Sequence, residues 1–223
     1  MKEPANESDF FLLLGSLLTI LFSSAVVHQI PGTWGQNLFS LVLILALVGG
    51  IWSLHASRRW QLFLLGTVGL VAGLAVVSRF SAWRVFDYLS LLLMVLLFLG
   101  MLRLTAGRVL FHGRVDANRL AGSLSLYLLL GLVWTLMYLV VLTLDAQALK
   151  GLAFENWRHA FPDVAYFSFV TLTTLGYGDI LPRDPLARFL AYLEAVTGVF
   201  YLAIVVASLV SIAIQEARDE DRD

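Results

Sequence analysis

The stretch Thr171-Leu172-Thr173-Thr174-Leu175-Gly176-Tyr177-Gly178-Asp179 decides how this chain folds. It follows a short apolar run, 164–170, which is too short to cross a bilayer, and it precedes a long apolar run, 189–214. Two glycines therefore flank a tyrosine at membrane depth. Irregular backbone is tolerated at that depth only where it lines a water-filled path or is buried in protein. The stretch predicts such a loop between a half-length helix and a full one.

Residues 174–178, Thr-Leu-Gly-Tyr-Gly, resemble the T-V-G-Y-G selectivity filter of the potassium-channel family, with leucine in place of valine. In that family backbone carbonyls replace the hydration shell of K⁺. Glycine adopts φ > 0 at little steric cost, which such a backbone needs at two positions. The resemblance implies the ion-binding residues Thr174, Leu175, Gly176, Tyr177 and Gly178, with K⁺ at the first four and Tyr177 packed behind the filter.

Residues around this motif are predicted to support it. The resemblance places Asp179 at the outer mouth, and Tyr166 on the preceding helix is a candidate partner for it. Glu194 is the one acid within 189–214, and a charge at mid-bilayer costs roughly 2.5–3.5 kcal/mol. It is therefore expected to face protein and to brace the filter through Thr171 or Thr173. A buried protonated acid with a purely structural bond is the alternative.

The helices on either side of the motif carry further expectations. Pro162 suits the first turn of the preceding helix, which should run to about Thr173. Gly198 lies 20 residues after Gly178, the spacing of the family's hinge glycine, and close packing is the alternative explanation. Four apolar residues spaced four apart are expected on one face of the last helix, namely Leu202, Val206, Val210 and Ile214. They form a candidate inner gate, and ordinary helix packing is the alternative.

Composition places the chain in a membrane. It is 59% hydrophobic and only 14% charged, whereas soluble domains are about 45–50% apolar. Apolar runs long enough to span hydrocarbon recur. They are 10–30, 38–54, 60–77, 85–102, 124–144 and 189–214. The first run is too long, and its front too acidic, for a cleaved signal peptide. The predicted fold is an all-α membrane protein with six transmembrane helices, a re-entrant pore helix and a selectivity filter, in a tetrameric channel.

The chain divides into four expected parts. Residues 1–104 form a peripheral four-helix domain, 105–123 a linker, 124–216 the pore domain and 217–223 a short tail. The fourth run carries no basic residue from 85 to 101, so strong voltage gating is not expected. The linker mixes arginine with apolar residues, which favours a helix in the membrane interface that couples to the gate. A plain connector whose arginines meet anionic lipid is the alternative.

Basic residues set the expected orientation. With the N-terminus inside, inner segments carry nine Lys and Arg and outer segments six. Both termini are thus expected in the cytoplasm. Residues 166–170 and 193–196 resemble bacterial six-helix members of the ion-channel family, a resemblance that covers the last 120 or so residues. It implies a multi-pass protein of a bacterial inner membrane.

The predicted function is passive, K⁺-selective conduction through a homotetrameric pore that is not strongly voltage-gated. A less selective cation channel and a non-conducting pore-like subunit are the alternatives. The expected partners are identical subunits and membrane lipids. Nucleic acid is not expected at a net charge of −1, and few residues follow Ile214, so no soluble regulatory domain is expected. No enzyme activity and no organic cofactor are expected, because no helix places His or acids at metal-ligand spacing.

Overall fold

The computed structural model describes residues 9–27, 33–55, 57–80, 84–111, 117–207 and 210. They form a mostly helical chain. The elements are α1 (Phe10–Val27), α2 (Thr33–Ser53), α3 (Arg58–Phe80), α4 (Arg84–Phe111), α5 (Ala117–Leu144), β1 (Leu149–Lys150), α6 (Trp157–Leu172), β2 (Leu181–Pro182), α7 (Pro185–Tyr201) and the π-helical turn η1 (Leu202–Val206). Among the described segments, five helices are long and apolar enough to cross a membrane, namely α2, α3, α4, α5 and α7. α1 is apolar but shorter.

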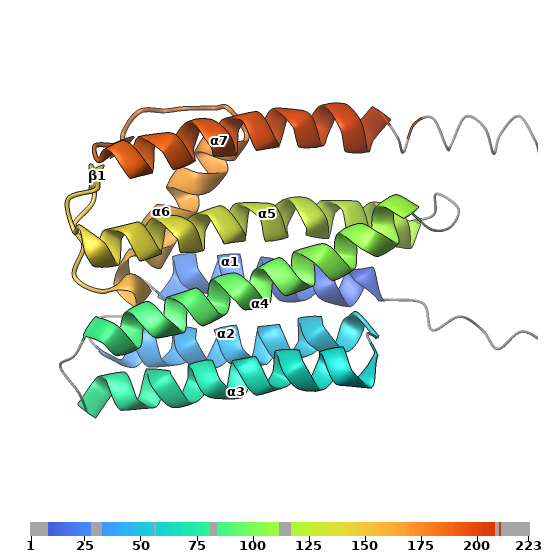
Figure 1. The fold of residues 1–223 in the computed structure, drawn as a ribbon, viewed down its shortest axis with the longest axis horizontal. Coiled ribbons are helices and arrows are strands. Elements are labelled where there is room, and N and C mark those ends of the chain that lie inside the picture. The colour runs from blue at the N-terminus through green and yellow to red at the C-terminus, as the bar shows by residue number, and fades with distance from the viewer. Residues whose placement is uncertain are drawn as a thin grey trace, which may run out of the picture.

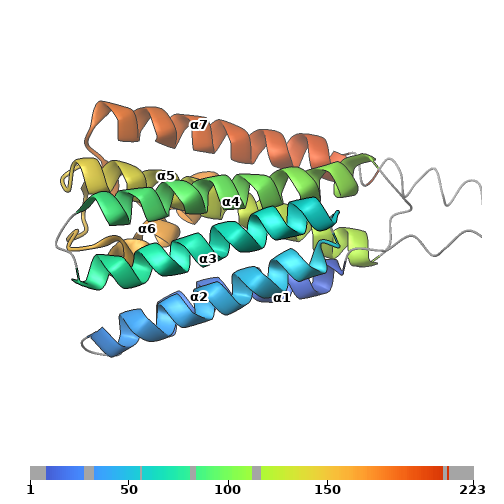
Figure 2. The ribbon, with the colours of Figure 1, turned by 60° about the horizontal axis from the view of Figure 1, so that its bottom comes forward.

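The long helices lie roughly parallel to one axis, and α6 runs obliquely near one end, as Figure 1 shows. α5 is the most buried of the candidate spans and packs against α1, α4, α6 and α7. α7 lies at one edge of the bundle in both views, with α2 toward the opposite edge (Figure 1 and Figure 2). α1 begins and α7 ends at the same end of the bundle (Figure 1). This arrangement brings residues far apart in the sequence together around α6.

The predicted linker 105–123 is not a separate helix in the described residues. Residues 105–111 extend α4, and 117–123 begin α5. Thr105 and Val109 are buried, so the end of α4 packs against the bundle, while a role of the linker in coupling to the gate stays a prediction. Residues 112–116, like 1–8, 28–32 and 211–223, lie outside the described residues.

Two arginines of this region bind the ends of helices. Arg119 donates from Nε to the carbonyl of Val109 at 2.8 Å, in the last turn of α4. Arg108 donates to the carbonyls of Leu54 and His55, which follow α2. The last carbonyls of a helix lack partners within it, so a guanidinium satisfies groups that would otherwise need water. This accounts for basic residues inside a packed bundle.

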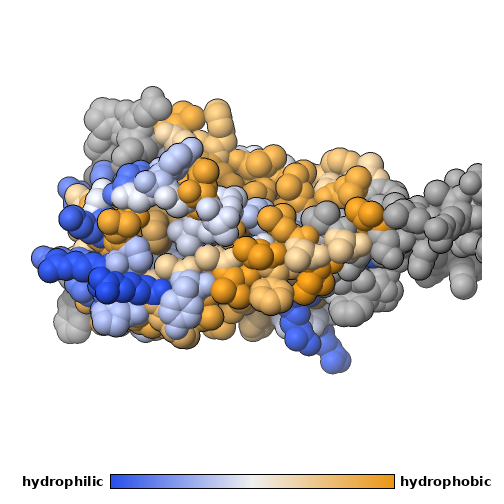
Figure 3. Space-filling view, turned by 90° about the horizontal axis from the view of Figure 1, so that it is seen from above, coloured by the Kyte–Doolittle hydropathy of each residue, from blue (hydrophilic) through white to orange (hydrophobic). Residues whose placement is uncertain are grey.

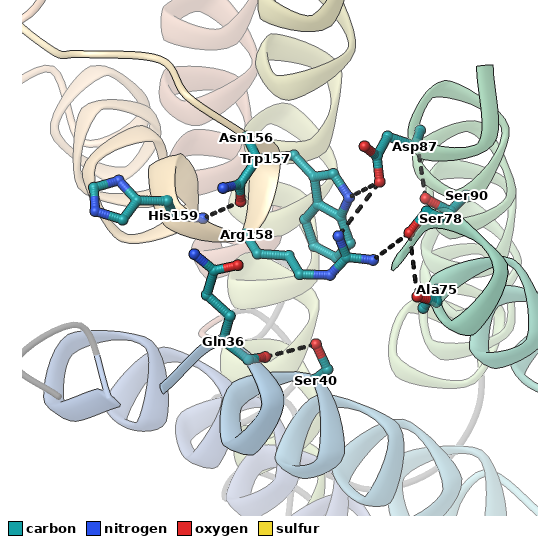
Figure 4. A network of polar contacts seen from close by, with 10 residues as sticks. All are labelled: Gln36, Ser40, Ala75, Ser78, Asp87, Ser90, Asn156, Trp157, Arg158 and His159. Carbon is teal, nitrogen blue, oxygen red and sulfur yellow. Dashed lines mark hydrogen bonds and ion pairs between the residues drawn. The ribbon is translucent and has the colours of Figure 1, made fainter. Parts of the chain in front are cut away.

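A polar network ties the first turn of α6 to α3 and α4, and Figure 4 shows it from close by. Arg158 forms an ion pair with Asp87 at 3.3 Å and donates to Ser78 Oγ at 3.3 Å. Trp157 donates from Nε1 to the same Asp87 oxygen at 3.2 Å, and its ring lies 4.5 Å from the Arg158 guanidinium carbon. The Arg158 side chain is only 9% exposed. The α1–α4 bundle is thereby fixed to the α6 of the same chain.

We expect Asp87 and Arg158 to be energetically coupled. Asp87→Asn should destabilise the protein more than Arg158→Met, because it leaves a nearly buried guanidinium without its carboxylate. The double variant should reveal a coupling of about 1–3 kcal/mol in thermal unfolding of the detergent-solubilised protein. The exposed Arg183, which bonds Gln147 at 2.9 Å, provides the control. Arg183→Gln should change stability by less than about 0.5 kcal/mol. Additive effects of the first two changes would contradict the coupling.

Candidate ion-conducting site

α6 begins earlier than the sequence indicated. Its N-cap is Asn156, whose side chain accepts the amide of His159 at 3.0 Å, so Pro162 lies inside the helix and the prediction of a first-turn proline is wrong. Trp157 and Phe161 are both buried, and helical packing of these rings outweighs the single backbone bond that proline removes. The other end agrees with expectation, because α6 ends at Leu172 and Thr173 is its C-cap.

The backbone after α6 alternates in the sign of φ. Thr174, Gly176 and Gly178 have φ of 60°, 57° and 78°, whereas the intervening Leu175 and Tyr177 do not have positive φ. The two glycines adopt the conformation predicted for them. The positive φ of Thr174 was not predicted, because a β-branched residue rarely adopts it. The alternation therefore begins at a residue that local preference would exclude.

Three amides of this segment, those of residues 174–176, point back at the end of α6. Leu175 and Gly176 both donate to the carbonyl of Val170, at 2.9 and 3.2 Å, and Thr174 donates to Thr171 at 2.9 Å. A trans peptide places its carbonyl opposite its N–H. The carbonyls of Thr174 and Leu175 belong to the two peptides that point at Val170, so both face away from α6. Successive carbonyls thus lie on one side of an exposed strand.

Tyr166 and Asp179 are in contact, as the sequence suggested. The Tyr166 hydroxyl donates to Asp179 Oδ2 at 2.8 Å. The Tyr166 ring also stacks on Tyr177, with ring centroids 6.5 Å apart and planes 10° from parallel. The bond from Tyr166 is the largest effect on Asp179 and lowers the pKa of this carboxyl below its usual value. The Tyr166 ring thus supports both the Tyr177 side chain and the residue that follows Gly178.

A short strand pair holds the chain beyond Asp179. β1 and β2 pair antiparallel, with Leu149 opposite Pro182 and Lys150 opposite Leu181. Gly151 has φ of 102°, and a Cβ there would lie 2.2 Å from the Asp179 carbonyl oxygen. Sequence reasoning missed Gly151, since a single glycine in a polar loop does not indicate which backbone will approach it. The segment before α6 thus contacts the end of the candidate filter.

Glu194 contacts α6, but not through the predicted threonines. Its side chain is fully buried, with Oε1 2.6 Å from Ser168 Oγ and Oε2 2.7 Å from Tyr138 Oη, both at hydrogen-bond distance. Thr171 and Thr173 instead donate to carbonyls of their own helix, a common alternative for threonine. The correct partners come from α6 and α5. Nothing in the local sequence marks Ser168 or Tyr138 as a partner of Glu194.

Gly198 packs against the last carbonyl of α6. A Cβ at Gly198 would lie 1.9 Å from the Leu172 carbonyl oxygen, so the close-packing explanation accounts for this glycine. The hinge role stays a prediction. Leu202 and Val206 lie in η1, and Leu202 and Val210 are exposed, while Ile214 lies outside the described residues. The described segment that holds Leu202 and Val206 is thus π-helical and not α-helical, and the inner gate stays a prediction.

Residues 123–215 match the family model described as "Ion channel". The chain is 43% identical over 77 residues to "Inward rectifier potassium channel Kirbac3.1" of Paramagnetospirillum magnetotacticum, which covers 33% of this chain and 26% of that protein. It is 31% identical over 100 residues to "Two-pore potassium channel 4" of Arabidopsis thaliana, covering 40% of this chain and 35% of that protein. The chain therefore spans about a third or less of the curated relatives it matches. No solved structure matches it significantly.

The similarity to the ion-channel family model is confined to the second half of the chain. The match contains α6, the φ-alternating segment 174–178 and α7. Residues 1–122, which include α1–α4, lie outside it. Among the described residues, no three His, Cys, Asp or Glu side chains converge on a metal site. Cation binding by the backbone carbonyls of residues 174–178 stays a prediction.

Gly198→Ala should destabilise the packing of α7 on α6. The added Cβ would overlap the Leu172 carbonyl, and such overpacking typically costs about 1–3 kcal/mol. Gly66→Ala is the matched control, since a Cβ at this helical glycine meets nothing within 4 Å. Thermal unfolding in detergent should show a lower midpoint for Gly198→Ala alone. Equal midpoints for the two variants would contradict the packing role and favour a hinge.

Tyr166→Phe should make the candidate filter more sensitive to acid. Because the folded-state pKa of Asp179 is lowered, the stabilisation is present above its unfolded pKa of about 3.9 and is lost as pH falls through the folded pKa. Without the tyrosine hydroxyl the folded pKa should rise toward the usual value, and the acid limb of ion flux in liposomes should move to higher pH. Tyr192→Phe on α7 is the control. An unchanged acid limb in Tyr166→Phe would show that this bond does not tune Asp179.

Proposed function

We propose that this chain is the subunit of a homotetrameric channel that conducts K⁺ passively and selectively through the filter 174–178. The observation that carries the proposal is the alternation of φ over Thr174, Gly176 and Gly178, with two amides held by the Val170 carbonyl. A run of carbonyls on one side of a strand is what a dehydrated K⁺ requires. The match to the ion-channel family and the partial similarity to two potassium channels support it.

The exposure of the filter supports assembly around an axis. Leu175 is 56% exposed and Tyr177 is 67% exposed in the single chain. One strand offers carbonyls on one side of an ion only, so a closed ring needs several copies related by rotation, and the family resemblance implies four. α7 and η1 carry exposed apolar residues, namely Leu186, Phe189, Val196, Val199 and Phe200 on α7 and Ile204 on η1. Figure 3 shows this face, largely apolar away from the hydrophilic end where α7 begins.

The distribution of arginine supports weak voltage dependence. A strong sensor moves several charges through the field, at about 2.3 kcal/mol per charge per 100 mV. α4 carries no basic residue from 85 to 102, and Arg108 is engaged with the carbonyls after α2. The α1–α4 bundle is then a peripheral domain that holds the pore half in place. We further propose a bacterial inner-membrane location with both termini in the cytoplasm, supported by the charge bias of the loops.

Flux from the purified full chain in liposomes tests the function. K⁺ should pass and Na⁺ should be largely excluded, and the complex should have the mass of a tetramer. Gly176→Ala should reduce K⁺ flux by roughly 5- to 30-fold, because an L-residue costs roughly 1–2 kcal/mol in the left-handed region that Gly176 occupies. Gly66→Ala, on α3, should leave flux unchanged.

The same assay separates the alternatives. Similar K⁺ and Na⁺ fluxes would indicate a less selective cation channel, and Leu175→Val would then test whether this departure from the family motif is the cause. An intact tetramer with no flux for either ion would indicate a non-conducting subunit. Either result overturns the proposed K⁺-selective channel.

A further inference from the structure

Glu194 joins three helices behind the filter through a chain of oxygen atoms. Its Oε2 lies 2.7 Å from Tyr138 Oη on α5, and its Oε1 lies 2.6 Å from Ser168 Oγ on α6. The same Ser168 Oγ lies 2.8 Å from the carbonyl oxygen of Gly131 on α5. The chain therefore runs from α5 through α7 and α6 and back to α5. Three oxygen–oxygen contacts of hydrogen-bond length connect four groups.

Counting hydrogens shows what these contacts require. Each of the three contacts needs one hydrogen between its oxygens. Tyr138 and Ser168 carry one hydroxyl hydrogen each, and the Gly131 carbonyl carries none. If Ser168 donates to Glu194, its contact with Gly131 has no hydrogen; if it donates to Gly131, its contact with Glu194 has none. A carboxylate can only accept, so the third hydrogen has to be carried by Glu194 itself.

The surroundings of Glu194 also favour the protonated, neutral form of its carboxyl group. Glu194, Tyr138 and Ser168 are each 0% exposed. An isolated carboxylate is costly to bury unless it is paired with a cation, and the described residues place no salt bridge on Glu194. The groups in hydrogen-bond contact with it are the hydroxyls of Tyr138 on α5 and Ser168 on α6. Neutral hydroxyls satisfy a carboxylic acid more readily than they stabilise an unpaired charge.

We propose that Glu194 is a neutral carboxylic acid that donates a hydrogen bond to Ser168 and so positions α6 for the filter. Tyr138 donates to Glu194 Oε2, Glu194 donates from Oε1 to Ser168, and Ser168 donates to the Gly131 carbonyl. Val170, whose carbonyl holds two filter amides, lies two residues after Ser168 on the same helix. Glu194 is thus a positioning residue, and its effect on conduction rests on the proposed function. The protonation of Glu194 is independent of the proposed function.

A neutral Glu194 and a charged Glu194 predict opposite effects of the substitution Glu194→Gln. In Glu194→Gln the amide oxygen accepts from Tyr138 and the amide nitrogen donates to Ser168, so the chain of bonds survives. Glu194→Ala removes the carboxyl group. The buried Tyr138 hydroxyl then loses its acceptor, and the buried Ser168 hydroxyl loses its donor. We expect K⁺ flux within about twofold of wild type for Glu194→Gln and a loss of roughly tenfold or more for Glu194→Ala. A charged brace would make the two variants similarly defective.

Infrared spectroscopy tests the proton directly. The wild-type protein in lipid at neutral pH should show the C=O stretching band of a protonated carboxylic acid, and this band should be missing from Glu194→Gln. Its presence does not depend on ion flux, so the inference can hold even if liposomes show no conduction. Identical spectra of wild type and Glu194→Gln in this region, or glutamine as defective as alanine in flux or thermal stability, would overturn it.

Discussion

The bonds between the last carbonyls of α6 and the amides that follow it are the constraint on which the rest of the structure depends. A helix end leaves carbonyls without partners inside the helix. Here Thr173 donates to Phe169, Thr174 to Thr171, and Leu175 and Gly176 to Val170. One set of bonds therefore caps α6 and turns the following carbonyls away from it. The position of α6 therefore determines the orientation of the Thr174 and Leu175 carbonyls.

Much of the remaining architecture holds α6 in place. Its first turn is tied to α3 and α4 through Arg158, its middle to α5 and α7 through Ser168, and its last carbonyl meets Gly198. These contacts come from helices distributed along the whole chain. The α1–α4 bundle, which lies outside the ion-channel match, thereby reaches the helix that orients the candidate filter. Of the two arginines that bind helix ends, Arg108 lies on α4 of this bundle and Arg119 lies in the first turn of α5.

The sequence predicted correctly those features that follow from the residue type within the motif itself. Gly176 and Gly178 could be assigned positive φ because the motif needs it, and Tyr166 could be paired with Asp179 because both lie beside the filter. It failed where tertiary contacts override local preference. Thr174 adopts a conformation that its own side chain disfavours, since its neighbours' amides are fixed by Val170.

Other errors arose where a local rule competed with burial or with a distant partner. Pro162 was expected in the first turn of α6, but the helix begins earlier, at the N-cap Asn156, and buries the rings of Trp157 and Phe161. The segment 105–123 had the composition of an interfacial helix, whereas in the structure two of its arginines, Arg108 and Arg119, bind carbonyls at helix ends. Ser168 and Tyr138 were missed as partners of Glu194 because they are separated from it by 26 and 56 residues. Such pairings depend on how the helices cross, which hydropathy does not encode.

The packing of α7 limits where that helix can move. Its buried residues, Ala187, Leu190, Glu194 and Gly198, form one narrow stripe against α5 and α6. The stripe ends at Gly198, and the α-helical bonding pattern gives way to η1 at Leu202. Bending α7 at or before Gly198 would shift its contact with the Leu172 carbonyl, two residues after the carbonyl that holds the filter amides. The regular α-helical geometry of α7 thus ends at Tyr201, only three residues beyond the last residue of this buried stripe.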